Sequence, residues 1–164
     1  MSLLDTQRFG GGIDDKGHLP LFHRGLLLKL QNCGIQLPKH ARLLDVGSGN
    51  GELLNYLREQ GLDAEGVDTE PRGPGVNKAD AAALPYASET FDCVMSKQAF
   101  DGAHYPQSQE DQRDMLGEIV RVLKRGGVYY AMENFFEPIA GLERLIDPSG
   151  SQASSLYRKS GLAS

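Results

Sequence analysis

Apolar positions along the chain follow two alternating patterns. Short runs that are apolar on both faces occur at 41–46 and 91–96, and such runs are typical of buried parallel strands. Other segments repeat apolar residues at helical spacing, as residues 115–123 do. The sequence therefore predicts strands alternating with helices, which form a parallel sheet with helices on both faces.

Local signals set the expected bounds of these elements. Ser108 and Asp111 have the spacing of a capping box before a helix, Gly61 suits a helix end, and "KRGG" ends the third helix. Helices are predicted at 19–33, at 52–60 and after Ser108. Strands are predicted at 41–46, 64–68, 76–79, 91–96 and 128–132.

Composition and charge narrow the class of protein. The 164 residues can bury one substantial core, so a single domain is expected over residues 1–164, with 1–18 as a flexible cap and 134–164 as a C-terminal segment. A net charge of −5 argues against a nucleic-acid partner and against an anionic membrane surface. No apolar run reaches the roughly 18 to 20 residues of a membrane span.

The termini and the cysteines indicate a cellular compartment. The N-terminus has no basic segment followed by an apolar one, so no signal peptide is expected. Cys33 and Cys93 are isolated and form no CxxC pair. Reduced thiols and a cytoplasmic location are expected.

The stretch "LLDVGSGNGELL" at 43–54 carries the main chemical signal. A strand ends in an acid, Asp45, and glycines follow at alternate positions, Gly47, Gly49 and Gly51. In parallel α/β sheets, ligands bind beyond the carboxyl ends of the strands. Glycine lets the backbone turn tightly and lets a ligand approach where a Cβ would otherwise lie. We therefore expect a ligand at this turn.

The residues around the turn disfavour phosphates. A phosphate-binding loop requires a lysine, but no lysine or arginine occurs between Asp45 and Tyr56. In a G-x-G-x-x-G reading the third glycine falls on Glu52, whose charge at the helix N-terminus is unfavourable for a pyrophosphate. The site is expected to hold a nucleoside without phosphates, and a positively charged group is favourable beside Asp45.

Two further acids end the next predicted strands. Asp68 is placed to accept hydrogen bonds from both ribose hydroxyls, and a solvated loop acid is the alternative. Asp80, with the adjacent Ala81 amide, can meet an adenine edge, and a helix or turn cap is the alternative. The two acids and the glycine turn together predict a nucleoside site.

Four blocks in order resemble the class I S-adenosylmethionine-dependent methyltransferases, in their type 11 branch. They are "LLDVGSGNGELL", "EGVD", "ADAAALPYASETFDCVMS" and "EIVRVLKRGGVYYAMEN", and the resemblance covers about residues 40–135. The family's fold is a Rossmann-like doubly wound, mostly parallel sheet, so the resemblance implies strand order 3-2-1-4-5. The resemblance also implies S-adenosylmethionine as the cofactor.

The resemblance assigns a role to each matching position. The backbone at Gly47, Gly49 and Gly51 would contact the methionine part of the cofactor, with Asp45 near its amino group. Asp68 would bind the ribose, and Asp80 and Ala81 the adenine. The residues implied at the methionine end and the substrate are Ser96, Lys97 and Gln98.

The leading functional hypothesis is methyl transfer to a small-molecule acceptor. The alternative is an inactive S-adenosylmethionine-binding module that works as a partner subunit. A nicotinamide-dependent oxidoreductase is disfavoured by Glu52. Blocks typical of enzymes that methylate nucleic-acid amino groups or cytosine C5 are absent, so a nucleic-acid acceptor is not expected.

No catalytic residue is assigned. Cys93 lies within a predicted strand and is expected to be buried rather than nucleophilic. His104 is either a base or a surface residue, while His18 and His23 lack metal-ligand spacing, so no metal is expected. The aromatic residues assigned either to an acceptor pocket or to the core are Tyr105, Phe135 and Phe136.

The C-terminus departs from the family. Members continue through a helix to two more strands, whereas here "EPIAGLERLI" is predicted as the helix and the chain ends soon after "SLYRKS". The last two strands are therefore expected to be absent, which leaves the apolar edge of 128–132 bare. We predict that residues 134–164 fold back over this edge, or that a second chain covers it as a partner or as a two-fold homodimer.

Overall fold

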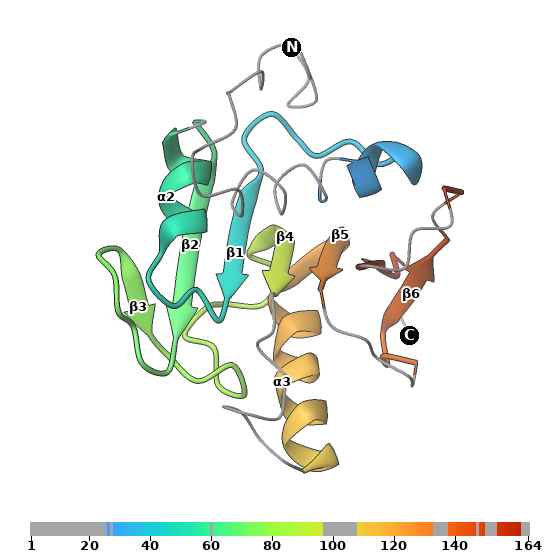
Figure 1. Cartoon of the computed structure of the whole chain (residues 1–164). Coiled ribbons are helices and arrows are strands. Elements are labelled where there is room, and N and C mark those ends of the chain that lie inside the picture. The colour runs from blue at the N-terminus through green and yellow to red at the C-terminus, as the bar shows by residue number, and fades with distance from the viewer. Residues whose placement is uncertain are drawn as a thin grey trace.

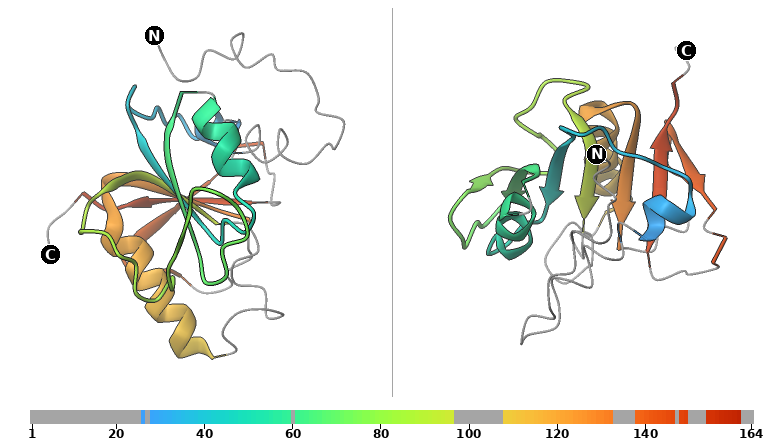
Figure 2. Two further views of the ribbon diagram at one scale, coloured as in Figure 1. Left: turned by 90° about the vertical axis from the view of Figure 1, so that its left-hand side faces the viewer. Right: turned by 90° about the horizontal axis from the view of Figure 1, so that it is seen from above.

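A computed structural model shows one seven-stranded sheet with helices on both faces (Figures 1 and 2). It describes residues 26, 28–59, 61–96, 108–132, 138–146, 148–149 and 154–161. The strands are β1 (Arg42–Val46), β2 (Asp63–Asp68), β3 (Val76–Lys78), β4 (Phe91–Ser96), β5 (Leu123–Ala131), β6 (Leu142–Leu145) and β7 (Ser155–Lys159). The helices are α2 (Glu52–Glu59) and α3 (Gln109–Val122), and residues 26 and 28–32 are also helical.

The sheet has strand order β3-β2-β1-β4-β5-β7-β6. The first five strands are parallel, which confirms the predicted order 3-2-1-4-5. β7 pairs antiparallel with both β5 and β6. The carboxyl ends of the five parallel strands therefore meet at one edge of the sheet, where α/β folds bind ligands.

Side-chain alternation divides the core into two layers, one on each face of the sheet. Helices α2 and α3 cover opposite faces (Figure 2). Leu44 and Val94 pack with the α3 residues Met115 and Ile119 on one face. On the other face, the neighbouring strand residues Leu43, Cys93 and Met95 pack with Leu54 and Leu57 of α2 and with the helical residues Leu26 and Leu30. Strands buried on both faces explain why the sequence shows continuous apolar runs there.

The C-terminal expectation was partly wrong. The last two strands are present, because β6 occupies part of the segment predicted as a helix and β7 is formed by "SLYRK". β7 pairs with β5 from Val128 to Ala131, so the chain itself covers the edge, as one arm of the prediction stated. The hydrogen-bonding groups of that edge are already paired within the chain, so β5 needs neither a homodimer nor a partner to cover it.

The bounds of the other elements differ less from the predicted ones. β5 begins at Leu123 rather than at 128, because the chain passes straight from α3 into the sheet and Leu123 pairs with Phe91. β3 ends at Lys78, one residue earlier than predicted. Ser108 caps α3, and its hydroxyl accepts the Asp111 amide, as expected. Among the described residues, the helices are too short or too polar to cross a bilayer.

An ion pair joins two of the sequence blocks. Arg121 of α3 donates to both carboxylate oxygens of Glu118 at 2.6 and 2.8 Å, and to the carbonyls of Leu84 and Tyr86 at 3.1 and 2.7 Å. Glu118 also accepts the Leu84 amide at 2.8 Å. The pair therefore fastens the loop after β3 to α3.

This ion pair predicts a pH-dependent stability. The Arg121 hydrogen bond lowers the pKa of Glu118 against the opposing effect of burial, and the Leu84 amide lowers it further. A lowered carboxyl pKa stabilises the fold above the unfolded value of about 4.3, and this stabilisation is lost as the pH falls through the folded value. Glu118→Gln should lower the free energy of unfolding by about 1 to 3 kcal/mol at pH 7.

Urea unfolding at pH 7 and at pH 3 would test this stability prediction. The difference between the wild-type protein and Glu118→Gln should shrink at pH 3, because the unfolded chain binds the proton at a higher pH than the folded protein, whose Glu118 pKa is lowered. Asp114→Asn, an exposed change on the same helix, serves as the control and should show no such pH-dependent loss. A difference that is equal at both pH values would contradict the ion-pair interpretation.

Candidate nucleoside site

The glycine turn lies between the carboxyl end of β1 and the first residue of α2 (Figure 1). Gly47, Gly49 and Gly51 all have left-handed backbones, with φ of 80°, 55° and 75°. A Cβ at Gly51 would lie 2.9 Å from the Val76 side chain of β3. The alternating glycines are therefore required both by the backbone and by close packing.

Asp45 is buried at the base of this turn. It is 4% exposed, and its carboxylate accepts the Ser48 hydroxyl at 2.8 Å. The Val67 carbonyl of β2 accepts the amides of Gly47 and Ser48 at 2.9 and 3.0 Å. The acid thus helps to hold the turn from beneath.

Asp68 ends β2 and holds the turn from the other side. Its Oδ2 accepts the Gly49 amide at 2.8 Å, and its Oδ1 accepts the Glu70 amide at 2.9 Å. A carboxylate has about four acceptor positions, so each oxygen keeps capacity for another donor. The Asp68 carboxylate is therefore fixed in orientation and can still accept hydroxyl protons from a ligand.

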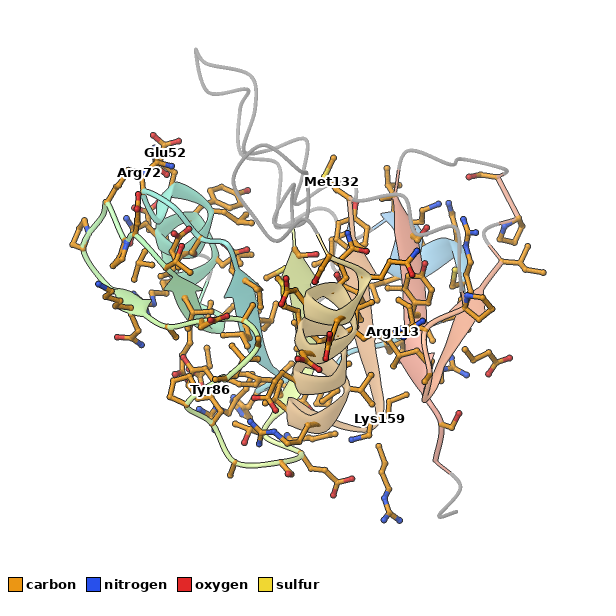
Figure 3. The ribbon with its side chains drawn as sticks, turned by 90° about the horizontal axis from the view of Figure 1, so that it is seen from below. Glu52, Arg72, Tyr86, Arg113, Met132 and Lys159 are labelled. Atoms are coloured by element: carbon orange, nitrogen blue, oxygen red, sulfur yellow. The ribbon has the colours of Figure 1, made fainter. Side chains whose placement is uncertain are left out.

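The loop after β2 folds back onto the glycine turn and brings in a residue that the sequence reasoning missed. The Arg72 amide donates to the Gly49 carbonyl at 3.0 Å. Arg72 Nη2 lies 3.4 Å from the position that a Cβ of Gly49 would occupy. Figure 3 shows Arg72 in the same corner of the molecule as Glu52, the first residue of α2.

The turn therefore has a cation nearby, although no basic residue occurs between Asp45 and Tyr56. Only the fold of the loop after β2 brings Arg72 there. The available sequence signal was the glycine at position 73. A Cβ there would overlap the Asn50 carbonyl, so only glycine lets this loop pack so closely on the turn.

Asp80, Ala81 and Ser96 lie at the carboxyl ends of the neighbouring strands. Asp80 Oδ1 accepts the Ala82 amide at 2.8 Å, so its side chain caps a turn. The Ala81 methyl group is buried in the core. Ser96 is fully buried, and its hydroxyl pairs with the Tyr129 hydroxyl at 2.7 Å. The Ala81 side chain thus lies in the core and the Ser96 hydroxyl has a partner, which leaves the backbone groups of these two residues for a ligand, whereas the exposed Asp80 carboxylate keeps acceptor positions.

Cys93 is a core residue. Its thiol is completely buried, and desolvation raises its pKa to about 12. At neutral pH the protonated thiol is a poor nucleophile. This agrees with the sequence prediction of a buried role.

The two cysteines should therefore differ in reactivity. Cys33 is half-buried, and neither cysteine forms a disulfide. Iodoacetamide at pH 8 should modify Cys33 in the native protein and leave Cys93 unmodified, whereas both should react in denaturant. Peptide mass spectrometry would show the sites, and rapid native modification of Cys93 would contradict its burial.

Several candidates lie outside the described residues. They are His18, His23, Lys97, Gln98, His104, Tyr105, Phe135 and Phe136. Within the described part of the chain, no cluster of three or more His, Cys, Asp or Glu side chains could hold a metal ion.

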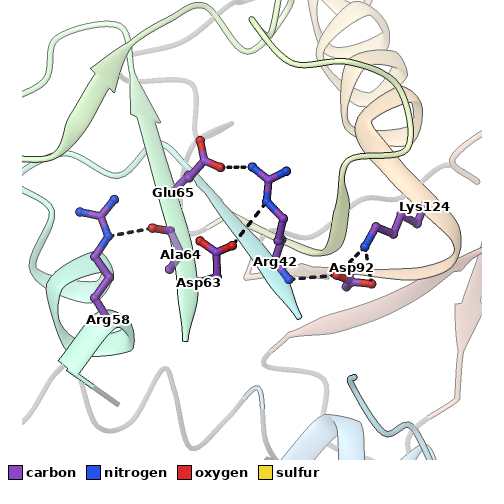
Figure 4. A network of polar contacts seen from close by, with 7 residues as sticks. All are labelled: Arg42, Arg58, Asp63, Ala64, Glu65, Asp92 and Lys124. Carbon is purple, nitrogen blue, oxygen red and sulfur yellow. Dashed lines mark hydrogen bonds and ion pairs between the residues drawn. The ribbon is translucent and has the colours of Figure 1, made fainter. Parts of the chain in front are cut away.

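The amino ends of the strands carry a charge network instead of a site (Figure 4). Arg42 contacts Asp63 at 3.6 Å and also pairs with Glu65, and its backbone amide donates to Asp92 at 2.9 Å. Lys124 binds both oxygens of Asp92 at 2.9 and 3.0 Å. Two cations thus pair with three acids, and the network joins β1, β2, β4 and β5 at the edge opposite the glycine turn.

Comparisons with known proteins agree with the arrangement of strands and turn. The model of the methyltransferase domain family matches residues 44–131. The chain is 30% identical to a malonyl-[acyl-carrier protein] O-methyltransferase of Enterobacter lignolyticus, over 55% of this chain and 38% of the relative. It is 33% identical to a demethylmenaquinone methyltransferase of Thermus thermophilus, over 56% of this chain and 46% of the relative. Each match thus spans less than half of the relative.

A solved structure matches the chain along its whole length. It is the complex between the Haloferax volcanii Trm112 methyltransferase activator and a protein described as the putative methyltransferase, with a TM-score of 0.55 and 17% identity. The match covers 99% of both chains. At this identity the likeness concerns the fold, and it includes the C-terminal strands that the sequence analysis had expected to be absent.

Proposed function

Because this chain belongs to the class I S-adenosylmethionine-dependent methyltransferase family, we propose that it transfers the methyl group of S-adenosylmethionine to a small-molecule acceptor. The observation that carries the proposal is the glycine turn of residues 47–51, held between the buried Asp45 and the oriented Asp68. When bound, the cofactor supplies an electrophilic methyl group on a sulfonium.

The residues of the site fit this cofactor. The Asp68 carboxylate keeps acceptor positions for the ribose hydroxyls, and the glycine turn offers backbone without side chains to the methionine part. Asp45 favours the amino group and the positive sulfonium by its charge. Asp80 and the Ala81 amide are assigned to the adenine, and Ser96 to the methionine end through its backbone.

In this scheme the chain acts mainly by positioning. Methyl transfer is an in-line displacement, so holding donor and acceptor aligned and away from water lowers the barrier. A general base is needed only for acceptors that must lose a proton. We place the reaction in the cytoplasm, because neither cysteine forms a disulfide.

Calorimetry with S-adenosylmethionine and S-adenosylhomocysteine would test cofactor binding. Methyl transfer from labelled cofactor into a cell extract would then test the reaction and identify the acceptor class. Failure of both ligands to bind would refute the proposal. Binding of both without transfer to any acceptor would leave the partner-subunit hypothesis.

The second candidate function is that of a methyltransferase subunit which needs a partner. It is favoured by the Haloferax volcanii structure, in which a chain with this fold lies in a complex with an activator. The pure protein would then bind S-adenosylhomocysteine, and methyl transfer would appear only after a second protein is added. Full activity of the pure protein would exclude this candidate.

A further inference from the structure

Arg72 lies where a ligand of the glycine turn must come closest. Glycine at position 49 leaves open the volume that a Cβ would fill, and this openness is what lets a ligand approach the backbone. In the structure, Arg72 Nη2 lies 3.4 Å from that Cβ position. A nucleoside bound over Gly49 must therefore either contact the guanidinium or displace it.

The Arg72 backbone is held in place from two sides. Its amide donates to the Gly49 carbonyl at 3.0 Å, and the next residue, Gly73, packs so tightly on Asn50 that no Cβ would fit. The side chain itself is exposed, and no described residue accepts a hydrogen bond or forms an ion pair with its guanidinium. The backbone is thus fixed beside Gly49, while the exposed side chain stays mobile enough to turn its donors toward a ligand.

We propose that Arg72 is a cofactor-positioning residue whose guanidinium donates to a ribose hydroxyl oxygen of the bound nucleoside. This inference rests on the proposed function. Asp68 and Arg72 are coupled through Gly49, whose amide donates to Asp68 and whose carbonyl accepts from Arg72. The ribose hydroxyls therefore meet an acceptor and a donor fixed on the same peptide turn.

The two charges complement the chemistry of a hydroxyl. Each ribose hydroxyl can donate one proton and accept at its oxygen lone pairs. Asp68 can only accept and Arg72 can only donate, so together they satisfy both capacities. The positive charge of Arg72 also offsets part of the negative charge that the nearby acids, Asp45, Asp68 and Glu52, bring to the site.

Binding of S-adenosylhomocysteine to four proteins would test the proposal. They are the wild-type protein, Arg72→Ala, Arg72→Lys and the control Arg113→Ala, an exposed arginine on α3 (Figure 3). Arg72→Ala should raise the Kd roughly tenfold or more, because one hydrogen bond to a charged group is lost. The Kd of Arg72→Lys should lie between those of the wild type and Arg72→Ala, since lysine keeps the charge and lacks the planar guanidinium. Arg113→Ala should bind as the wild type does.

A ligand pair separates a ribose contact from an indirect effect on the loop. Adenosine should bind the wild type more tightly than 2′,3′-dideoxyadenosine does, and Arg72→Ala should reduce that ratio. Thermal unfolding of the ligand-free variants should stay unchanged, because the guanidinium has no partner among the described residues.

Equal or tighter binding of S-adenosylhomocysteine by Arg72→Ala would show that the guanidinium is displaced, and would overturn the inference. An unchanged adenosine to dideoxyadenosine ratio would also overturn it. Absence of binding by the wild type would instead refute the proposed function, so the two failures are distinguishable.

Discussion

Gly49→Val is expected to abolish binding of S-adenosylhomocysteine while the sheet stays folded. Position 49 has φ of 55°, a left-handed backbone that costs a β-branched residue about 1 to 3 kcal/mol. The valine side chain would also project toward Arg72 and fill the space through which the ligand approaches. Loss of both the turn geometry and this space should raise the Kd more than 100-fold, an effect of roughly 3 kcal/mol or more.

A matched control separates backbone strain from loss of the site. Gly34 also has a left-handed φ, of 68°, but a Cβ there would meet nothing within 4 Å. Gly34→Val should therefore lower the melting temperature to a similar degree and keep ligand affinity. Normal binding by Gly49→Val would mean that the turn does not approach the cofactor, and the central argument for the site would fail.

Asp68→Ala should weaken S-adenosylhomocysteine binding by roughly 2 to 4 kcal/mol. Two charge-assisted hydrogen bonds to the ribose are lost, each worth about 1.5 to 3 kcal/mol and not fully additive. The change also removes the acceptor of the Gly49 and Glu70 amides, so the turn itself should loosen. Calorimetry would give the affinity, and thermal unfolding would report the effect on the turn.

Asp63→Ala provides the control for the Asp68 experiment. Asp63 is the acid at the opposite end of the same strand, where it is largely exposed beside Arg42 at 3.6 Å. Its removal should leave binding intact and affect stability by less than about 1 kcal/mol, as is usual for surface ion pairs. Equal affinity of Asp68→Ala and Asp63→Ala for S-adenosylhomocysteine would show that Asp68 does not bind the ribose.

The parallel half of the sheet could be predicted from sequence because its signals are local. Runs such as "FDCVMS" are buried on both faces, and the glycines after β1 stand where the backbone has positive φ. The capping residue Ser108 and the burial of Cys93 were predicted for the same reason. Each of these features depends on residues that are close together along the chain.

The antiparallel half could not be predicted in this way. Ile139, Leu142 and Leu145 have the spacing of a helix face, and the four residues of β6 are too few to show alternation. Only pairing with β7 makes this segment a strand, and β7 in turn needs the edge of β5, far earlier in the chain. Tertiary pairing therefore overrode the local preference.

The candidate site also combines features that are local in the sequence with features that depend on tertiary contacts. The sequence by itself determined that a turn of three glycines follows the acid-tipped β1 and that Asp68 ends the next strand, since both features are local. Only the tertiary structure decided that Arg72 lies over Gly49 and that Ser96 pairs with Tyr129. Those contacts join residues whose approach depends on how loops fold and on which face of a strand each side chain occupies.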